Sequence, residues 1–207
     1  DCVNLHTNVM CVTELFEDGA TINYDKKVHI VPPIWAVKGD KLRVYDPHTL
    51  SFKGYVTVED FKDKRIYAQK GGAELCVGDL ITNEYYFPSV EISGVVCKNC
   101  RSRPFVLQST DSATVTDCDF YGCGPAIYIS AAFYKWLEAG PAKNITIEGN
   151  RFHSTWARSK NTGMVFIRLA EDPEMKFHHI HKNIVIRNNR FEGIPFYPIW
   201  AYATDGL

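Results

Sequence analysis

One short pattern recurs four times in the second half of the chain. Its copies begin at residues 90, 113, 145 and 184, which is 23, 32 and 39 residues apart. The first copy reads Val90-Glu91-Ile92-Ser93-Gly94, and it alternates apolar with polar side chains as a half-buried β-strand does. A strand, a polar turn and a second strand, repeated at about this period, are typical of a solenoid of parallel β-coils.

The second strand of each coil also alternates, which assigns it an inner and an outer face. These strands are expected at residues 104–109, 126–130, 164–169 and 199–203. Side chains along a strand point alternately to opposite faces. One apolar set is therefore predicted to point into the coil: Ile127, Ile129, Val165 and Ile167. The other set is predicted on the outer face: Tyr128, Ser130, Phe166, Arg168, Trp200 and Tyr202.

Residues 1–15 are expected to form a further β-helix strand. Asn4 and His6 alternate there with apolar residues, so they join the same outer face. Exposed aromatic rings beside Arg, Asn and His are suited to stacking on sugars and hydrogen-bonding their hydroxyl groups. The pattern predicts a carbohydrate-binding surface, and the alternative is that long loops cover these aromatic rings.

The intervening residues 16–88 have a different character. Short β-runs such as residues 41–45 are separated by turn sequences such as Gly39-Asp40. This pattern predicts a small antiparallel barrel or sandwich inserted into the solenoid. Residues 89–207 are then expected to hold the parallel β-helix coils.

The composition excludes several classes of partner. With 207 residues, 45% of them hydrophobic, the chain has enough apolar material for a sizeable core. The net charge is −1, and the sequence has no basic stripe that would suggest nucleic-acid binding. No apolar run is long enough to span a membrane. The oligomeric state is left open. Asp1 opens within a strand-like pattern and Leu207 falls where another coil would begin, so we expect a fragment of a longer protein.

The cysteine and histidine spacings do not predict a metal site. Cys97-x-x-Cys100 stands alone among the seven cysteines. Cys100 and Cys123 occupy equivalent places in successive coils, about one strand spacing of 4.8 Å apart. This predicts buried thiols rather than a disulfide. The run His178-His179-Ile180-His181 lacks the spacing of common zinc sites and is interpreted as the rim of a polar cleft.

Two long loops, residues 131–144 and 170–183, are expected to rise beside the outer face. Hydrolysis of a glycosidic bond needs one carboxyl group to donate a proton and another to activate water or attack the sugar. Asp1 is the best candidate because it precedes the strand of Asn4 and His6; the alternative is a solvated turn residue. The carboxylates expected near the groove are Asp1, Asp111, Asp119, Glu138, Glu171 and Asp172.

Several segments together resemble one enzyme family. Asp1-Cys2-Val3-Asn4-Leu5-His6 is similar to a strand of the form Asp-Asp-x-x-Asn-x-His-Gly, starting at its second Asp. Residues 39–50 look like the barrel inserted after that strand. Residues 136–141 look like a Trp-x-Glu-x-Gly loop, and residues 200–207 like the entry into a further coil. By these segments the chain resembles the β-helical exo-α-1,3-galactosidases of glycoside hydrolase family 110.

The resemblance implies an all-β fold: a right-handed, single-stranded parallel β-helix of the pectate-lyase-like kind with a small inserted antiparallel β-barrel. It implies an inverting exo-glycosidase that hydrolyses terminal α-1,3-linked galactose from glycans. It also implies that no metal or other cofactor is needed, and a secreted or periplasmic location.

The resemblance also implies roles for individual residues. Asp1 matches a catalytic aspartate whose partner acids lie upstream, so the active site is expected to be incomplete in this fragment. Asn4 and His6 would line the galactose subsite, and Trp136 and Glu138 would close it from their loop.

Two other positions bear on the same subsite. Arg103 matches an Arg at the head of the family's next strand. Thr7 stands where the family pattern has Gly, and a side chain there is expected to narrow the approach to the groove.

Two other functions are alternatives, and the outer face and loops fit the first of them equally well. A non-catalytic β-helical module of the glycan-binding or adhesin type would use the same outer face and loops. A polysaccharide lyase would need a basic residue such as Arg168 as proton acceptor and usually calcium, but the chain has no dense Asp cluster on one strand.

Overall fold

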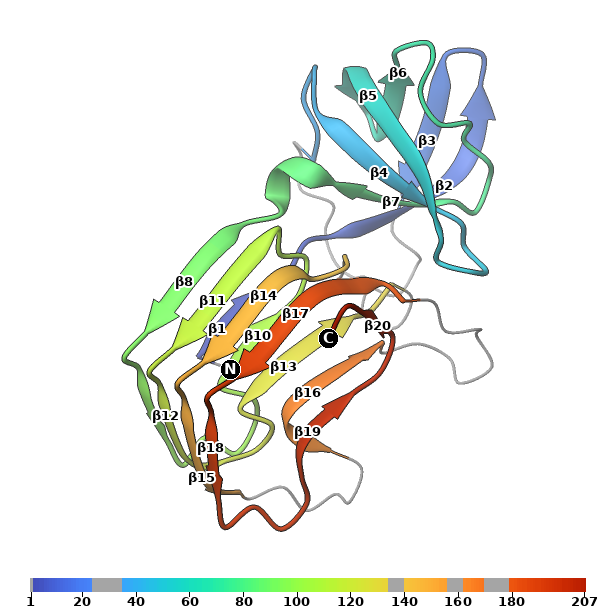
Figure 1. Cartoon of the computed structure of the whole chain (residues 1–207). Coiled ribbons are helices and arrows are strands. Elements are labelled where there is room, and N and C mark those ends of the chain that lie inside the picture. The colour runs from blue at the N-terminus through green and yellow to red at the C-terminus, as the bar shows by residue number, and fades with distance from the viewer. Residues whose placement is uncertain (1, 24–34, 134–139, 156–161, 170–178) are drawn as a thin grey trace.

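The computed structural model describes residues 2–23, 35–133, 140–155, 162–169 and 179–207. In this part the chain forms a stack of parallel β-coils and a closed barrel (Figure 1). No helix among these residues is long and apolar enough to cross a membrane.

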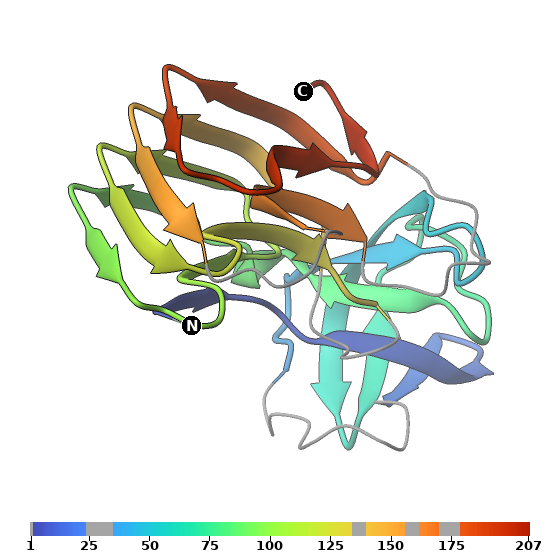
Figure 2. The ribbon, with the colours of Figure 1, turned by 90° about the horizontal axis from the view of Figure 1, so that it is seen from below.

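The repeated pattern forms the first sheet of the coils. Its strands are β8 (Ser89–Ser93), β11 (Ser112–Thr116), β14 (Lys143–Glu148), β17 (His181–Arg187) and β20 (Thr204–Asp205). They pair in parallel in the order β20-β17-β14-β11-β8. Ala113 lies opposite Val90 on one side and Ile145 on the other, so equivalent apolar residues stack. The predicted solenoid is confirmed, and Figure 2 shows its coils stacked from green to red.

Each coil contains three strands rather than the two that the sequence indicated. A short middle sheet joins β9 (Val96–Lys98), β12 (Asp119–Cys123), β15 (Arg151–Thr155) and β18 (Arg190–Glu192). Its inner face is a column of aromatic rings. Phe152 stacks between Phe120 and Phe191 at centroid distances of 5.0 and 4.7 Å. Two of these strands have only three residues, and all four follow the first sheet after a two-residue corner, so the sequence does not separate them from the turn.

The third sheet carries the predicted outer face. Its strands are β1 (Val3–Leu5), β10 (Phe105–Leu107), β13 (Ile127–Ala131), β16 (Gly163–Leu169) and β19 (Tyr197–Ala201), in that order. The prediction of its inner face is confirmed, because four apolar side chains are fully buried there: Ile127, Ile129, Val165 and Ile167.

The corner between the first and middle sheets needs a left-handed backbone, which Asp, Asn and Gly adopt most readily. Gly94, Asp117, Gly149 and Asn188 have φ values of 67°, 52°, 68° and 55°. The residue after this corner is Asn150 in the third coil, and it is fully buried.

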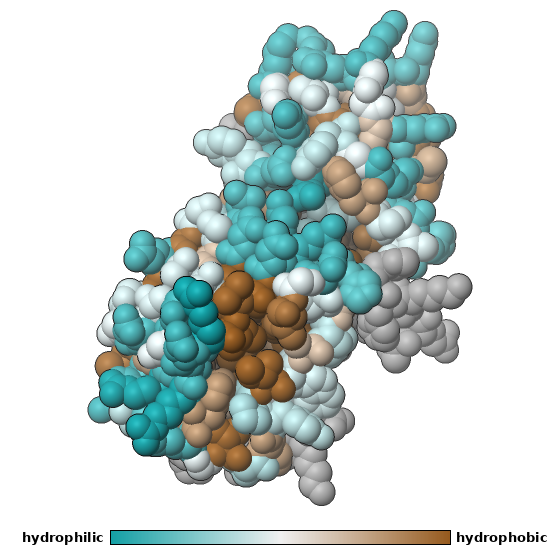
Figure 3. Space-filling model, viewed as in Figure 1, coloured by the Kyte–Doolittle hydropathy of each residue, from teal (hydrophilic) through white to brown (hydrophobic). Residues whose placement is uncertain are grey.

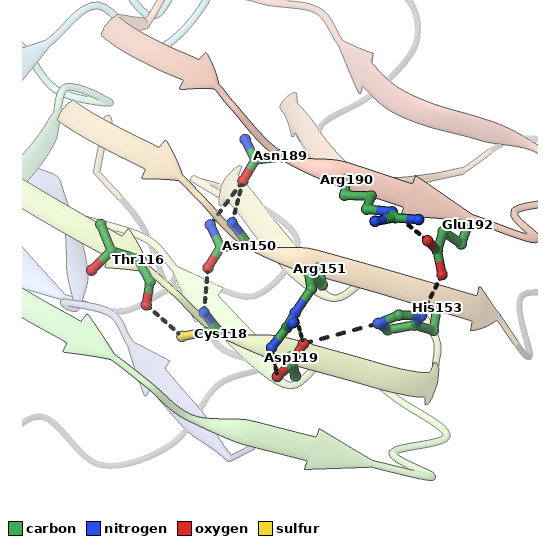
Figure 4. Close-up of polar contacts among 9 residues, drawn as sticks. All are labelled: Thr116, Cys118, Asp119, Asn150, Arg151, His153, Asn189, Arg190 and Glu192. Carbon is green, nitrogen blue, oxygen red and sulfur yellow. Dashed lines mark hydrogen bonds and ion pairs between the residues drawn. The ribbon is translucent and has the colours of Figure 1, made fainter.

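A polar ladder crosses the coils at this corner (Figure 4). The Asn150 Nδ2 donates to the Val115 carbonyl at 2.9 Å and to the Asn189 Oδ1 at 3.0 Å. The Asn150 Oδ1 accepts from the Cys118 N–H at 2.9 Å. The ladder therefore ties three successive coils together through a buried side chain.

The barrel consists of antiparallel strands inserted after β1. They are β2 (Val9–Phe16), β3 (Gly19–Asn23), β4 (Lys41–Tyr45), β5 (Phe52–Lys62), β6 (Arg65–Ala68) and β7 (Leu80–Asn83), closed in the order β2-β3-β6-β5-β4-β7. A 3₁₀ turn, η1 (Glu84–Tyr86), leads back to the coils.

The expectation that residues 1–15 form a β-helix strand is wrong for most of this range. Only β1 pairs with the coils, and β2 already belongs to the barrel. A strand of the β-helix and a strand of the barrel both need apolar residues, so hydrophobicity alone did not reveal that the chain passes from one sheet to the other. The antiparallel pairing of Met10 with Ile81 places β2 in the barrel.

The barrel core is continuous with one corner of the coils. Its buried cluster includes Ala131 at the end of β13, Ala132 and Phe133 directly after it, and also Leu169 and Ile180. The Phe133 ring meets the Tyr45 ring of β4 edge-on at 5.1 Å. The barrel is thereby packed at the carboxyl ends of β13 and β16, beside the third sheet (Figure 2).

The last coil leaves interior positions partly exposed. Figure 3 looks onto this coil and shows apolar side chains gathered between β17 and β19. Ile199 is in the inner column of the third sheet but is 39% exposed, because no further strand covers it among the described residues.

Candidate functional site

The outer face of the third sheet brings residues from distant parts of the chain into two rows. In the first row Asn4 lies opposite Val106, and the register continues through Tyr128, Phe166 and Trp200. In the second row Arg168 lies opposite Ser130. Alternation adds His6, Gln108 and Tyr202 to that second row.

The aromatic rings of the first row cover one another instead of lying open. Tyr128 meets Phe166 at 5.6 Å and Phe166 meets Trp200 at 5.7 Å, measured between ring centroids. Tyr128 is 8% and Phe166 7% exposed, and both pack with Val106, Trp200 and Tyr202. The prediction of an exposed aromatic surface is therefore wrong for Tyr128 and Phe166, because ring-to-ring packing along the row, edge-on for Tyr128 with Phe166 and tilted for Phe166 with Trp200, removes them from solvent.

The second row of the outer face is polar, and its side chains differ in exposure. His6 is exposed, Ser130 is fully buried and Arg168 is half-buried. Gln108 is 4% exposed, and it was not among the residues that the sequence assigned to the outer face. Its backbone N–H donates to the Leu5 carbonyl at 2.8 Å, which fixes it beside β1.

The predicted substrate-binding residues fall into two groups. Asn4 and His6 are exposed on this face, as their strand register requires. Arg103 is half-buried, with its guanidinium carbon 4.8 Å from the Tyr128 ring centroid, which brings it to the same face. Asp1, Trp136 and Glu138 lie outside the described residues.

Thr7 does not face solvent. It is 4% exposed, so its side chain packs within the molecule.

The histidine run does not form a cleft rim as a unit. His179 is exposed, and its Nδ1 lies 2.7 Å from the Thr204 carbonyl oxygen. His181 is fully buried. Its Nδ1 accepts from the Ala142 N–H at 3.2 Å, so its Nε2–H donates to the Arg168 carbonyl at 2.9 Å. Burial lowers the pKa of His181 to about 4, which keeps the imidazole neutral. His178 lies outside the described residues.

The other candidate carboxylates are not brought to the face where the structure describes them. Asp111 lies between β10 and β11 and pairs with Lys143 at 3.4 Å. Asp119 lies on the outer face of the middle sheet (Figure 4). Arg151 donates to both of its oxygens, at 2.6 and 2.8 Å, and holds the pKa of the Asp119 carboxyl below its usual range. Glu171 and Asp172 lie outside the described residues.

His153 joins the same middle-sheet surface. It stacks on Tyr121 with centroids 4.4 Å apart, and its Nδ1 is 3.0 Å from Glu192 Oε2. Asp119 pairs with Arg151 and Glu192 with Arg190, while the buried Nε2 of His153 has no hydrogen-bond partner in the described part of the chain. The surface is therefore mainly a ladder of exposed ion pairs.

The cysteines agree with the predicted thiol ladder. All seven are thiols, Cys123 is fully buried and Cys100 is half-buried. Burial raises the pKa of the Cys123 thiol, which makes it unsuited to act as a nucleophile. No group of three or more His, Cys, Asp or Glu side chains in the described ranges is placed to hold a metal ion.

An open cavity of about 660 Å³ lies elsewhere, in the barrel, between the turn joining β2 to β3 and residues 68–75. None of the described residues on the outer face of the third sheet lines it. The cavity is therefore separate from the outer face of the third sheet.

The fold has counterparts among known proteins. The family model described as "Right handed beta helix region" matches residues 66–207, and the chain belongs to this family. Its handedness agrees with the fold that the resemblance implied.

Relatives with curated names point in the same direction. Alpha-1,3-galactosidase A of Streptomyces avermitilis is 32% identical over 120 residues, which cover 56% of this chain and 18% of that protein. Alpha-1,3-galactosidase B of Akkermansia muciniphila and of Phocaeicola vulgatus are 24% and 26% identical over 100% of this chain, covering 27% and 38% of those proteins. The chain thus spans well under half the length of these relatives. Their names confirm the resemblance to α-1,3-galactosidases.

Proposed function

We propose that this chain is part of an inverting exo-glycosidase that hydrolyses terminal α-1,3-linked galactose from glycans. The observation that carries the proposal is the register of the third sheet. Asn4 and His6 lie on one face with Arg103 and Arg168, and this group of hydrogen-bonding side chains supports the proposal of a sugar subsite there. Relatives that carry the α-1,3-galactosidase name support the substrate class.

In the proposed mechanism Asp1 acts as the acid or the base, and a second carboxyl group completes the pair. An inverting enzyme holds its two carboxyl groups about 6.5–9.5 Å apart, so that a water molecule fits between the base and the sugar. Coils repeat about every 4.8 Å. Carboxyl groups from different coils therefore reach this separation readily. Asn4 and His6 would hydrogen-bond the galactose, and Trp136 and Glu138 would close the subsite. External glycans as substrates would place the protein outside the cytoplasm, in a secreted or periplasmic location.

The test is release of galactose from a terminal α-1,3-galactoside by the full-length natural protein and by its Asp1→Asn variant. Loss of a catalytic carboxyl group is expected to lower kcat by at least about a hundredfold. Asp111→Asn, on an exposed residue, is the matched control and is expected to keep full activity. Equal turnover by the Asp1→Asn variant and the unmodified protein would remove Asp1 from the mechanism.

One observation favours a second function, a glycan-binding module without catalysis. The described strands of the third sheet contain no Asp or Glu on either face. Such a module would bind galactosides, keep that binding in the Asp1→Asn variant and release no sugar from the full-length protein. An unsaturated product would indicate a lyase instead.

A further inference from the structure

Two buried polar atoms on the outer face of the third sheet have no hydrogen-bond partner in the described part of the chain. They are the Oε1 of Gln108, a residue that is 4% exposed, and the Nε of Arg168. A buried donor or acceptor left unpaired is destabilising, because it has given up its hydrogen bonds to water. Such groups are uncommon in native proteins, and a bound ligand is one established reason for keeping them.

The strand register places these two atoms in one row. Arg168 lies opposite Ser130, and Gln108 follows Leu107, which lies opposite Ile129. Gln108 and Arg168 are thus two strands apart, roughly 10 Å along the sheet. The Ser130 hydroxyl between them donates to the Ala131 carbonyl at 3.3 Å, so its proton is already used. The distance suits one pyranose ring hydrogen-bonded at both of its edges.

Arg168 is held in a fixed place. Its guanidinium carbon lies 5.6 Å from the Phe166 ring centroid. Its carbonyl accepts the Nε2–H of the buried His181, whose other ring nitrogen is bonded to the Ala142 N–H. A residue fixed on both sides loses little entropy when it binds a ligand.

The chemistry of the pair selects a neutral polyol. The amide of Gln108 both donates and accepts, and the guanidinium of Arg168 donates only. Vicinal sugar hydroxyl groups satisfy both residues, because each hydroxyl donates and accepts. The adjoining aromatic row offers apolar edges to the C–H groups of the same ring.

We propose that Gln108 and Arg168 are specificity-determining residues that hydrogen-bond hydroxyl groups of the galactose unit from opposite edges. The inference rests on the proposed function and deepens it, because it names the residues that recognise the sugar rather than those that cleave the bond.

The experiment measures the Kd of galactose and of its monodeoxy analogues for the full-length protein. The variants are Gln108→Met, which removes the amide, and Arg168→Lys, which keeps the charge but loses the Nε donor. Each is expected to weaken galactose binding about tenfold to a hundredfold. The deoxy analogue that lacks the partner hydroxyl is expected to lose no further affinity in the matching variant, because the bond is already gone.

The controls make the same substitutions away from the face. Gln69→Met acts in the barrel, where Gln69 donates to Glu59, and Arg190→Lys acts on the middle sheet, where Arg190 pairs with Glu192. Both are expected to bind galactose as the unmodified protein does. If Gln108→Met fails to fold, Gln108→Asn keeps the polarity and withdraws the amide by one methylene, and the same loss with the same deoxy analogue is expected.

The outcomes separate the two proposals. A folded Gln108 or Arg168 variant that binds every sugar as the unmodified protein does overturns the inference and leaves the proposed function standing. Tighter binding of a galacturonic acid than of galactose also overturns it, because Arg168 would then recognise a carboxylate. An unmodified full-length protein that neither binds galactose nor releases it overturns the proposed function itself.

Discussion

At the scale of single residues, His181 connects stability to the candidate site. It is fully buried, and both of its ring nitrogens are hydrogen-bonded to backbone groups, one of them the carbonyl of Arg168. The motif around it suggested a cleft rim from the sequence. A run with three histidines in four residues is polar, so the sequence indicates an exposed segment. His181 is buried because the preceding coil packs against it, and the sequence of the run does not reveal this. The outcome is a structural histidine that holds a residue of the outer face.

The lowered pKa of His181 predicts that the protein loses stability in acid. Its pKa in the fold is about 4 against 6.5 in the unfolded chain, so the unfolded state binds more protons between these values. The contribution of neutral His181 to the free energy of unfolding is complete above pH 6.5. It is lost as the pH falls toward 4, and the full loss amounts to about 3 kcal/mol. Denaturant titrations at pH 7 and pH 4.5 are expected to show that His181→Gln flattens this pH dependence. His48→Gln, on an exposed barrel residue, should leave the dependence unchanged. An unaltered slope in the His181 variant contradicts the assignment.

At the scale of elements, the repeat was readable because its alternation is long enough. The predicted starts at 90, 113, 145 and 184 all fall in the first sheet. The middle strands were missed because β9 and β18 have only three residues, and because each middle strand follows the first sheet after a corner of only two residues. The exposure of Tyr128 and Phe166 was misjudged because alternation gives the direction of a side chain but not what its neighbours cover.

The corner ladder explains how short strands form a rigid stack. Asn150→Ala removes the Oδ1 that accepts from Cys118 and the Nδ2 that donates to Val115 and Asn189, and leaves their groups buried. The expected loss is about 2–4 kcal/mol. Thermal unfolding of the full-length protein measures it, with Ser93→Ala, at an exposed position of β8, as the control. A melting temperature within a degree of the unmodified protein would show that the ladder is dispensable.

At the scale of the whole molecule, the barrel core extends into one corner of the coils, while the interior of the coils forms a separate cluster. The insertion was visible in the sequence as a change of pattern, but its contact with the coils was not. That contact depends on Phe133 and Ile180, which are far from the barrel in the sequence. It sets the barrel beside the carboxyl ends of β13 and β16, next to the candidate site.

Removing one ring should loosen this junction selectively. Phe133→Ala takes away the edge-on contact with Tyr45 and leaves a cavity, at an expected loss of about 3–5 kcal/mol. Hydrogen exchange is expected to rise in β4 and at the end of β13, while β11 and β14 in the first sheet stay protected. Uniform deprotection of barrel and coils would indicate that they unfold as one unit.

The central claim is that the outer face of β1, β10, β13, β16 and β19 binds the terminal galactose. A crystal structure of the full-length protein with galactose bound tests it most directly. The account predicts the sugar between Asn4 and His6 on one side and Arg168 on the other. Galactose bound instead to the middle-sheet surface around Tyr121 and His153, or in the barrel cavity, would contradict it.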